Sequence, residues 1–297
     1  MEGLTLRLLK QDELALIPSF WKESVGVPVE LRFIKRWYQL DPEGFRVAVD
    51  SKNRILGMAT VVRQSDTLYV MGYMGVDKDY RGKGIAKQLL ENLVARKPGA
   101  NYALNASADK LGIYLRRGFK VAEDSYGYAY VGKFTVEPEK KSPPGGLELI
   151  QIKMGSSHLA DLVAYDKEVA GFQRNVELLQ LSDPTAIVLA VKQKGKIVAY
   201  GKIQHYLLGG AWLGPLYADD VDIAKYLVEA LMRHFESQRC VFLFTILSEQ
   251  ARPIAQALNM MLADKISRCY MKLEAEYLPA HKLQKVYSFD DPGFAFL

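Results

Sequence analysis

Residues Thr67 to Ala95 read TLYVMGYMGVDKDYRGKGIAKQLLENLVA, and this stretch predicts the architecture of the first half of the chain. Its first part, residues 68–76, is apolar and aromatic with no charge, which favours a buried strand. After the glycines at 82 and 84, apolar residues recur with the spacing of one helix face. The stretch therefore predicts a strand, a glycine-rich turn and a helix in direct succession.

The turn from Arg81 to Ala86 has the features of an anion site. The first N–H groups of a helix have no partner inside the helix and carry the positive end of its dipole. Glycines at 82 and 84 let a ligand approach the backbone, and Arg81 and Lys83 add positive charge. The turn is not a Walker loop, and Lys87 stands where a dinucleotide fingerprint needs its third glycine.

Two spaced patterns identify the kind of loop. Arg81, Gly84 and Ala86 fit Arg-x-x-Gly-x-Ala, and further along the chain Tyr114, Gly118 and Phe119 fit Tyr-x-x-x-Gly-Phe. Together the patterns resemble the GNAT superfamily of acyl-CoA-dependent N-acyltransferases. The resemblance implies that the loop binds the pyrophosphate of acetyl-CoA and that Tyr114 protonates the departing thiolate. It implies a cofactor site made of Met74, Gly75, Val76, Arg81, Gly82, Lys83, Gly84, Ile85, Ala86, Asn105 and Tyr114.

A β-bulge is expected in the strand that ends at Val76, where backbone amides near Met74 could polarise the thioester oxygen. The general base is left open, because no Asp or Glu lies between Tyr69 and Val76. Candidates are Glu23, Glu30 and Tyr73, each of which could equally have a surface or packing role.

The expected reaction is transfer of an acyl group, expected to be acetyl, to the amine of a small molecule such as an amino acid or amine metabolite. Two alternatives remain: a non-catalytic acyl-CoA-binding or sensor protein, and a protein N-acetyltransferase. Residues 1–136 hold 21 Lys and Arg against 15 Asp and Glu. This basic balance suits a polyanionic cofactor, and without a basic stripe or DNA-binding motif no nucleic acid is expected.

The order of predicted elements repeats once along the chain. The expected fold is α+β (mixed α/β) with two tandem GNAT-like domains, each a mixed, mostly antiparallel sheet flanked by helices. We expect a catalytic domain at 1–136, a linker at 137–146 that reads EPEKKSPPGG, and a degenerate domain at 147–297 that closes the acceptor site.

The second half lacks the cofactor signals. The turn from Gly214 to Asp222 has no glycine pair and three Asp, which suit the helix dipole but repel a pyrophosphate. Asn259 and Met260 stand where Gly-Phe would be. Asp166, Gly171 and Arg174 make this half similar to two-domain, YitH-like GNAT proteins. A helix is expected to end near Ala170, just before Gly171, so that Arg174 lies in a loop facing the cleft and clamps an anionic group of the acceptor. Asp166 is expected either to orient Arg174 or to hold the substrate ammonium, and the alternative for the pair is a structural ion pair.

The remaining expectations come from composition. No apolar run approaches the ~20 residues of a membrane span and no signal peptide is visible, so a cytoplasmic protein with no membrane partner is expected. Cys240 and Cys269 are expected to be buried free thiols, and the four histidines share no metal spacing, so no metal is expected. The duplication imitates a dimer, which favours a monomer.

Overall fold

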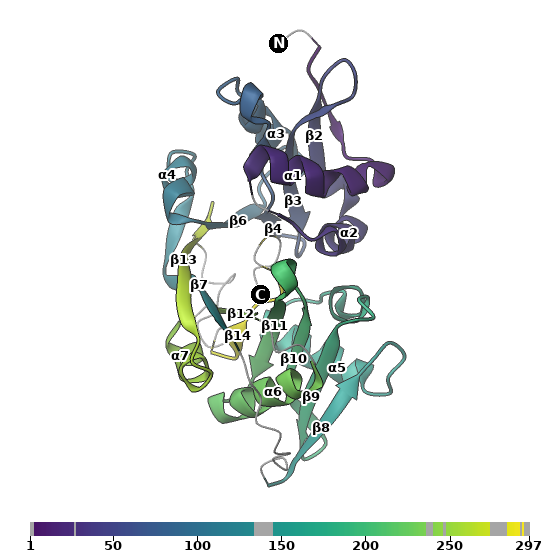
Figure 1. Ribbon diagram of the computed structural model, residues 1–297, viewed down its shortest axis with the longest axis vertical. Coiled ribbons are helices and arrows are strands. Elements are labelled where there is room, and N and C mark those ends of the chain that lie inside the picture. Colours follow the sequence, from purple (N-terminus) through teal and green to yellow (C-terminus); the bar gives the residue numbers. More distant parts are fainter. Residues whose placement is uncertain are drawn as a thin grey trace. The chain divides into compact units, whose positions relative to one another are not determined.

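The computed structural model describes residues 3–26, 28–133, 145–235, 240–245, 248–273, 284–291 and 293. The chain divides into two compact units, Met1–Leu104 and Asn105–Leu297 (Figure 1). Both units combine helices with a mostly antiparallel sheet, so the predicted α+β class is confirmed. No helix in the described ranges is both long enough and apolar enough to cross a membrane.

The sheet of the first unit has the order β1-β2-β3-β4-β6. Its strands are β1 (Thr5–Leu8), β2 (Phe45–Val49), β3 (Ile55–Arg63), β4 (Leu68–Met71), β5 (Gly75–Val76) and β6 (Asn101–Ala106). Neighbours from β1 to β4 are antiparallel, and β4 runs parallel to β6 with Leu68 opposite Asn101. β2 and β3 consist mostly of apolar residues and are bounded by polar turns, a composition that favours buried strands.

The helices of the first unit are α1 (Ile17–Val25), α2 (Leu31–Leu40) and α3 (Ile85–Val94). A 3-10 turn, Gln11–Leu16, directly precedes α1. Pro18 lies in the first turn of α1, where its missing N–H costs nothing, so a new helix starts there.

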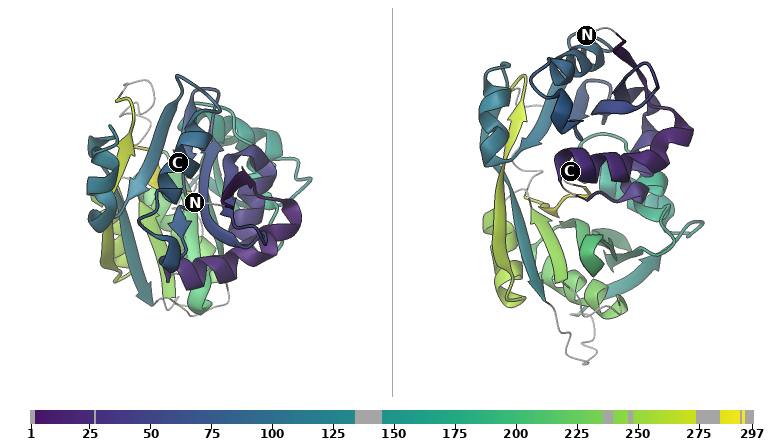
Figure 2. Two further views of the ribbon diagram at one scale, coloured as in Figure 1. Left: turned by 90° about the horizontal axis from the view of Figure 1, so that it is seen from above. Right: turned by 45° about the horizontal axis from the view of Figure 1, so that its top comes forward.

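Helices α1 and α3 cover opposite faces of this sheet (Figures 1 and 2). A Cβ on Gly57 would lie 2.9 Å from Ile85 of α3, whereas a Cβ on Gly75 would lie 2.6 Å from Val25 of α1. Gly75 pairs with Met58, the residue after Gly57, so the two glycines point to opposite faces. Both positions exclude a side chain because a helix lies directly against the strand.

The strand predicted over 68–76 is interrupted, as the expected bulge requires. Between the pairs Met58–Gly75 and Val61–Met71, β3 contains two residues and the opposite segment contains three. One extra residue on one strand is the definition of a β-bulge. β4 pairs with both β3 and β6, whereas β5 pairs with β3, so the chain leaves its register beside β6 after Met71.

The second unit has the sheet order β13-β7-β12-β11-β10-β9-β8. Its strands are β7 (Lys120–Lys133), β8 (Leu147–Ile152), β9 (Ile187–Gln193), β10 (Lys196–His205), β11 (Ala211–Ala218), β12 (Cys240–Thr245), β13 (Met261–Tyr270) and β14 (Val286–Ser288); its helices are α4 (Ala108–Leu115), α5 (Leu159–Ala170), α6 (Val221–His234) and α7 (Ser248–Ala257). Residues 120–136 were expected to complete the first domain. β7 instead lies between β12 and β13, and the predicted linker falls largely outside the described residues.

The second sheet has a core on each face. Helix α6 covers one face with Leu227, Leu231 and their neighbours, and α5 covers the other with Leu162, Tyr165 and Val169. The α5 face also buries polar residues on alternate positions of β10, namely Tyr200, Lys202 and Gln204, all fully buried. This face therefore encloses a polar network inside an apolar shell.

Strand β14 was not predicted from the sequence. β11 pairs in parallel with β12 only over Ala211–Leu213, and β14 then takes up pairing with Leu216 and Tyr217. The Ser288 hydroxyl donates to the Leu213 carbonyl at 2.9 Å, and the Ala218 N–H donates to the Lys285 carbonyl at 3.0 Å. β12 pairs with the first part of β11 only, and β14, a later segment of the chain, pairs with the remainder.

Candidate active site

The glycine-rich turn begins α3 as predicted. Gly84 is the N-cap of α3 with φ of 80°, and Gly82 has φ of 74°. Both lie in the left-handed region, which glycine adopts without a steric penalty. A Cβ at Gly82 would meet nothing within 4 Å, and one at Gly84 only the tip of Gln88 at 3.9 Å, so the turn is open to a ligand.

The backbone donors of this turn are left for a ligand. Within the described part of the chain, no group accepts a hydrogen bond from the N–H groups of residues 82–87. Gly84 provides no side-chain cap, and the first turn of α3 contains no acidic residue. Unpaired N–H groups at a helix start, with no carboxylate beside them, form an anion site.

The side chains of Arg81 and Lys83, the two cations of the turn, donate hydrogen bonds to backbone carbonyls of the same chain. Arg81 donates to the Val76 carbonyl at 3.2 Å and to the Ser24 carbonyl near the end of α1. Lys83 donates to the Asp79 carbonyl at 3.0 Å, and its Nζ lies 4.5 Å from the centre of the Tyr80 ring. Arg81 and Lys83 therefore fix the turn, and the backbone of residues 82–86 presents the donors.

A cavity of about 660 Å³ lies beside this turn in the first unit. It is lined by Leu16, Phe20, Glu23, Ser24, Asn53, Arg54, Ile55, Asp77, Lys78 and Asp79. Arg54 and Asp77 form an ion pair at 3.5 Å, and Arg54 also donates to the Tyr80 hydroxyl at 3.0 Å. Ser24 and Arg54 were not predicted from the sequence to line a cavity. A single polar residue on a helix or in a hairpin belongs to no spaced motif by which it could be recognised.

Of the three candidate bases, only Glu23 lines this cavity. Glu30 is half-buried before α2, with one carboxylate oxygen 3.4 Å from Arg32. Tyr73 lies in the bulged segment with its ring 4.9 Å from that of Trp21, edge to face, beside the half-buried Met74. Glu23 therefore differs from Glu30 and Tyr73 in that it lines the cavity, whereas Glu30 lies beside Arg32 and the Tyr73 ring packs against Trp21.

Tyr114 and Asn105 belong to the second unit, where both are half-buried. Tyr114 lies in α4 with its ring edge-to-face against Phe119 at 6.0 Å. Burial raises the pKa of its hydroxyl, and nearby Cys269 adds to this, while Arg117 opposes it. The phenol therefore holds its proton at neutral pH, which an acid needs.

The end of α4 has an equivalent in the second half. After α4, the Phe119 N–H donates back to the Tyr114 carbonyl and Gly118 has φ of 88°; after α7, the Met260 N–H donates to the Ala255 carbonyl and Asn259 has φ of 51°. Both are Schellman-type ends with a left-handed residue. The match places Ala255 where the first copy has Tyr114, so the second copy lacks the phenol.

The second copy also satisfies its own helix start. The Asp220 carboxylate caps α6 by accepting from the N–H groups of Asp222 at 3.0 Å and Ile223 at 2.9 Å. These are the donors that a phosphate would use, and they already face a negative charge. This cap gives a physical reason for the prediction that this half lacks an anion site.

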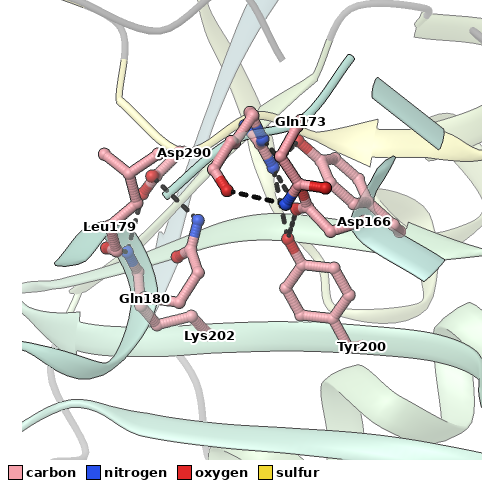
Figure 3. A network of polar contacts seen from close by, with 9 residues as sticks. Asp166, Gln173, Leu179, Gln180, Tyr200, Lys202 and Asp290 are labelled. Carbon is pink, nitrogen blue, oxygen red and sulfur yellow. Dashed lines mark hydrogen bonds and ion pairs between the residues drawn. The ribbon is translucent and has the colours of Figure 1, made fainter. Parts of the chain in front are cut away.

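Asp166 and Arg174 form a buried network (Figure 3). Arg174 Nε donates to Asp166 at 2.9 Å, and its Nη2 donates to Asp166 and, at 3.1 Å, to Tyr217. Tyr200 donates to the same carboxylate, and the Arg174 side chain is 3% exposed. Gly171 ends α5 as predicted, but the expectation that Arg174 faces a cleft is not met, because the chain turns it inward onto Asp166.

A second buried ion pair lies along the same strand. Lys202 donates to Asp290 at 2.6 Å and to the Leu179 carbonyl at 3.0 Å, and Gln180 donates to Asp290 at 3.0 Å. Figure 3 shows this group beside the Asp166 group, above β10. Asp290 follows β14, so the pair ties the late segment to the sheet.

Comparisons with known proteins agree with these two halves. Residues 41–121 match a family model described as "Acetyltransferase (GNAT) domain", and residues 162–288 match another with the same description. The chain belongs to the GNAT superfamily. It contains two GNAT domains in tandem, and the first match includes both the Arg81 loop and the Tyr114 signature.

One curated relative is named as an N-acetyltransferase. An uncharacterized N-acetyltransferase of Bacillus subtilis strain 168, the SPbeta prophage-derived YokL, is 31% identical over 99 residues, which are 30% of this chain and 56% of the relative. The chain thus spans about half the length of this curated relative.

Two solved structures share the tandem fold. A putative acetyltransferase from Pyrococcus horikoshii has a TM-score of 0.78 at 16% identity, covering 99% of this chain and 97% of its own. A tandem GNAT protein from the clavulanic acid biosynthesis pathway has a TM-score of 0.64 at 13% identity, covering 90% and 98%. At these identities the likeness concerns the fold alone.

Among the described residues, no group of three or more His, Cys, Asp and Glu could hold a metal ion. Cys269 is a buried free thiol as predicted, and burial raises its pKa to about 11. The side chain of Cys240 lies outside the described part.

Proposed function

We propose that this protein is an acyl-CoA-dependent N-acetyltransferase whose first GNAT domain binds acetyl-CoA and whose acceptor is a small amine. The observation that carries the proposal is the start of α3. Its N–H groups have no acceptor in the described chain, its cap is a glycine at positive φ, and no carboxylate lies in its first turn. Such a start suits a pyrophosphate better than any neutral ligand.

In the proposed reaction the lone pair of a neutral amine attacks the thioester carbonyl carbon. A C–N bond forms, the C–S bond breaks, and the sulfur leaves with the bonding pair. The amine gives up one proton to a base and then to solvent, and the thiolate takes one proton to become CoA. Holding both reactants in line supplies most of the rate in such a transfer. The bulge between Met71 and Gly75 is where we place the amides that polarise the thioester oxygen.

Tyr114 is the proposed acid for the thiolate, on the strength of the signature and of its raised pKa. The second domain is proposed to work without its own cofactor, because Asp220 caps α6 and Ala255 replaces the phenol.

Two measurements with the full chain test the proposal. Calorimetry with acetyl-CoA should give micromolar or tighter binding, and thiol release from acetyl-CoA should depend on an added primary amine. Binding without any amine-dependent thiol release, over a broad amine panel, would favour the acyl-CoA sensor. Absence of acetyl-CoA binding would end the proposal.

A further inference from the structure

Thr60, in β3, has a buried hydroxyl group without a hydrogen-bond partner. The residue is 2% exposed, and within the described part of the chain its Oγ1 makes no hydrogen bond. Burying a hydroxyl without a partner costs stability, and nearly all buried polar groups in folded proteins are paired. An exception of this kind requires a reason, and functional sites are where such exceptions are expected.

The Thr60 hydroxyl lies beside the β-bulge of the first unit. Thr60 belongs to the part of β3 that faces the bulge, between its paired positions 58 and 61. Its carbonyl accepts from the N–H of Gly72, the first residue of the bulge, at 3.1 Å. Gly72 therefore stands opposite Thr60 and is only half-buried. Because glycine has no side chain, no cross-strand neighbour covers the hydroxyl on this side.

The side chain of Thr60 points to the sheet face that α1 and α2 cover. Residues paired across neighbouring strands share a face, and so do alternate residues of one strand. Thr60 pairs with Phe45, whose ring lies edge to face against Tyr38 of α2 at 5.3 Å. Met58, two residues before Thr60, pairs with Gly75, which points to α1. The hydroxyl is thus directed between the bulge and these two helices.

The second copy has an equivalent bulge with a different polar residue beside it. Between paired positions 201 and 203, β10 contains one residue, Lys202, and the opposite segment of β11 contains two. Lys202 directly precedes a paired position, as Thr60 does, but its ammonium group is satisfied by Asp290 at 2.6 Å and the Leu179 carbonyl at 3.0 Å. One of the two bulge residues is Pro215, which has no N–H to donate. The copy without the glycine-rich turn therefore fills this position with an ion pair, whereas the other copy leaves a hydroxyl open.

The two faces of the first bulge suit two different reactants. The turn proposed for the phosphates begins α3, and α3 covers the face opposite to Thr60. The α1 face is then left for the acceptor, and the end of α1 is held by the hydrogen bond from Arg81 to the Ser24 carbonyl. Direct transfer needs the amine and the thioester at the bulge together, and approach from opposite faces keeps them from competing for space.

We infer that the Thr60 hydroxyl orients the acceptor, by accepting a hydrogen bond from an N–H of a primary amine and so directing its lone pair at the thioester carbon. The hydroxyl oxygen has lone pairs for this bond, and the β-branched side chain holds it in few rotamers. The hydroxyl keeps its own proton throughout. A primary amine retains one N–H in the product amide, whereas a secondary amine retains none, so primary amines are preferred. The inference rests on the proposed function and adds a residue to its acceptor side.

The test removes the two parts of the Thr60 side chain separately, in the full chain. With acetyl-CoA and n-butylamine at pH 9, we expect Thr60→Val to lower the kcat/KM of the amine about tenfold, the size of one hydrogen bond, and to leave the Kd of acetyl-CoA within about threefold. Thr60→Ser keeps the hydroxyl and should stay within about threefold of the unaltered protein. For N-methylbutylamine, Thr60→Val should cost less than about threefold. Thr5→Val removes an exposed hydroxyl from β1 and, as the control, should change nothing.

Stability distinguishes this role from packing. Because the hydroxyl has no partner to lose, Thr60→Val should keep or raise the Tm, whereas Thr60→Ser leaves a small cavity and should lower it by a few degrees. The order of activity is then opposite to the order of stability, which a packing role does not produce. Methyl NMR of the complex with CoA, which cannot react, adds a direct measurement: n-butylamine should shift the methyl signal of Thr60 and not that of Thr5.

Failures of the two proposals are distinguishable. A normal kcat/KM in Thr60→Val, or an active protein whose Thr60 methyl signal does not respond to n-butylamine, would overturn the inference. If the unaltered protein binds n-butylamine at Thr60 but releases no thiol from acetyl-CoA, the result counts against the proposed function and leaves the amine contact intact. If it shows neither response, both proposals are wrong.

Discussion

The guanidinium of Arg81 donates to the carbonyl oxygen of Ser24 and so joins the start of the glycine-rich turn to the end of α1. Carbonyls near a helix C-terminus are partly negative, and a cation there stabilises the helix. The second bond, to Val76, ties the same side chain to the end of β5. The structure gives Arg81 a positioning role between the turn and the cavity wall.

Arg81→Lys keeps the charge but loses the fork that reaches both carbonyls. We expect the acceptor KM to rise about tenfold, which corresponds to roughly 1.4 kcal/mol, while the Kd of acetyl-CoA changes less than about threefold. Steady-state kinetics and calorimetry measure the two. The reverse split, with weakened acetyl-CoA binding and a normal acceptor KM, would show that Arg81 contacts the phosphates.

Gly84→Glu should abolish acetyl-CoA binding. The new side chain forces a left-handed L-residue, at a cost of about 1–2 kcal/mol, and brings a carboxylate to the unpaired N–H groups. Gly155→Glu is the matched control, since Gly155 also has positive φ and open space but lies in the second half. Calorimetry should find no binding in the first variant and normal binding in the control. Unchanged affinity of Gly84→Glu would place the cofactor elsewhere.

One acetyl-CoA should bind per chain, because Asp220 already occupies the donors at the start of α6. Asp220→Ser keeps a cap while removing the charge, so the stoichiometry should stay at one and the unfolding free energy should fall by less than about 1 kcal/mol. Calorimetry and equilibrium denaturation give both numbers. A stoichiometry near two for the unaltered protein would contradict the loss of the second site.

Tyr114→Phe removes the hydroxyl proposed to protonate the thiolate. We expect kcat to fall by ~10²–10⁴-fold with little change in the Kd of acetyl-CoA. Because burial raises the pKa of Tyr114, the phenol stays protonated up to and beyond its usual pKa of about 10. The unaltered enzyme should therefore show no loss of kcat from this group between pH 7 and pH 10, and a Phe variant with normal kcat would reduce Tyr114 to packing.

Arg174→Met should destabilise the second unit without changing acceptor kinetics. Removing the guanidinium leaves the fully buried Asp166 without its ionic partner, a loss of about 3–5 kcal/mol where a buried pair is broken. Lys225→Met is the control, since Lys225 pairs with Asp222 at the surface. Equilibrium denaturation should separate the two variants. If Arg174→Lys instead raised the acceptor KM without changing the stability, the result would support the hypothesis that Arg174 binds the acceptor.

The sequence predicted those features that local pattern controls. The strand, turn and helix around Gly84, the bulge before Gly75 and the end of α5 at Gly171 all follow from apolar spacing and glycine conformation. The degeneracy of the second copy stays a prediction, and two features agree with it: Asp220 caps α6, and Asn259 has the positive φ that Gly118 has in the first copy.

Features that depend on distant pairing could not be predicted in this way. β14 has three residues, too few for a periodic signal, and its partner β11 lies far earlier in the chain. The position of β7 between β12 and β13 has the same cause. The directions of individual side chains could not be predicted either. An Arg in a loop is usually exposed, and only the tertiary structure shows that Arg174 contacts Asp166 and that Arg81 contacts Ser24.

The place of β14 bears on the order in which the molecule is made. Val286–Ser288 is translated after every other strand of its unit, yet it pairs with β11, and Asp290 behind it neutralises the fully buried Lys202. Until that segment leaves the ribosome, the second sheet has a vacant edge at Leu216 and Tyr217 and a lysine without its counter-ion. The first unit needs none of these residues for its own sheet. The two GNAT domains are therefore expected to complete their folding at different times during synthesis. A chaperone would bind the surface that the second domain exposes before its last segment has been synthesised.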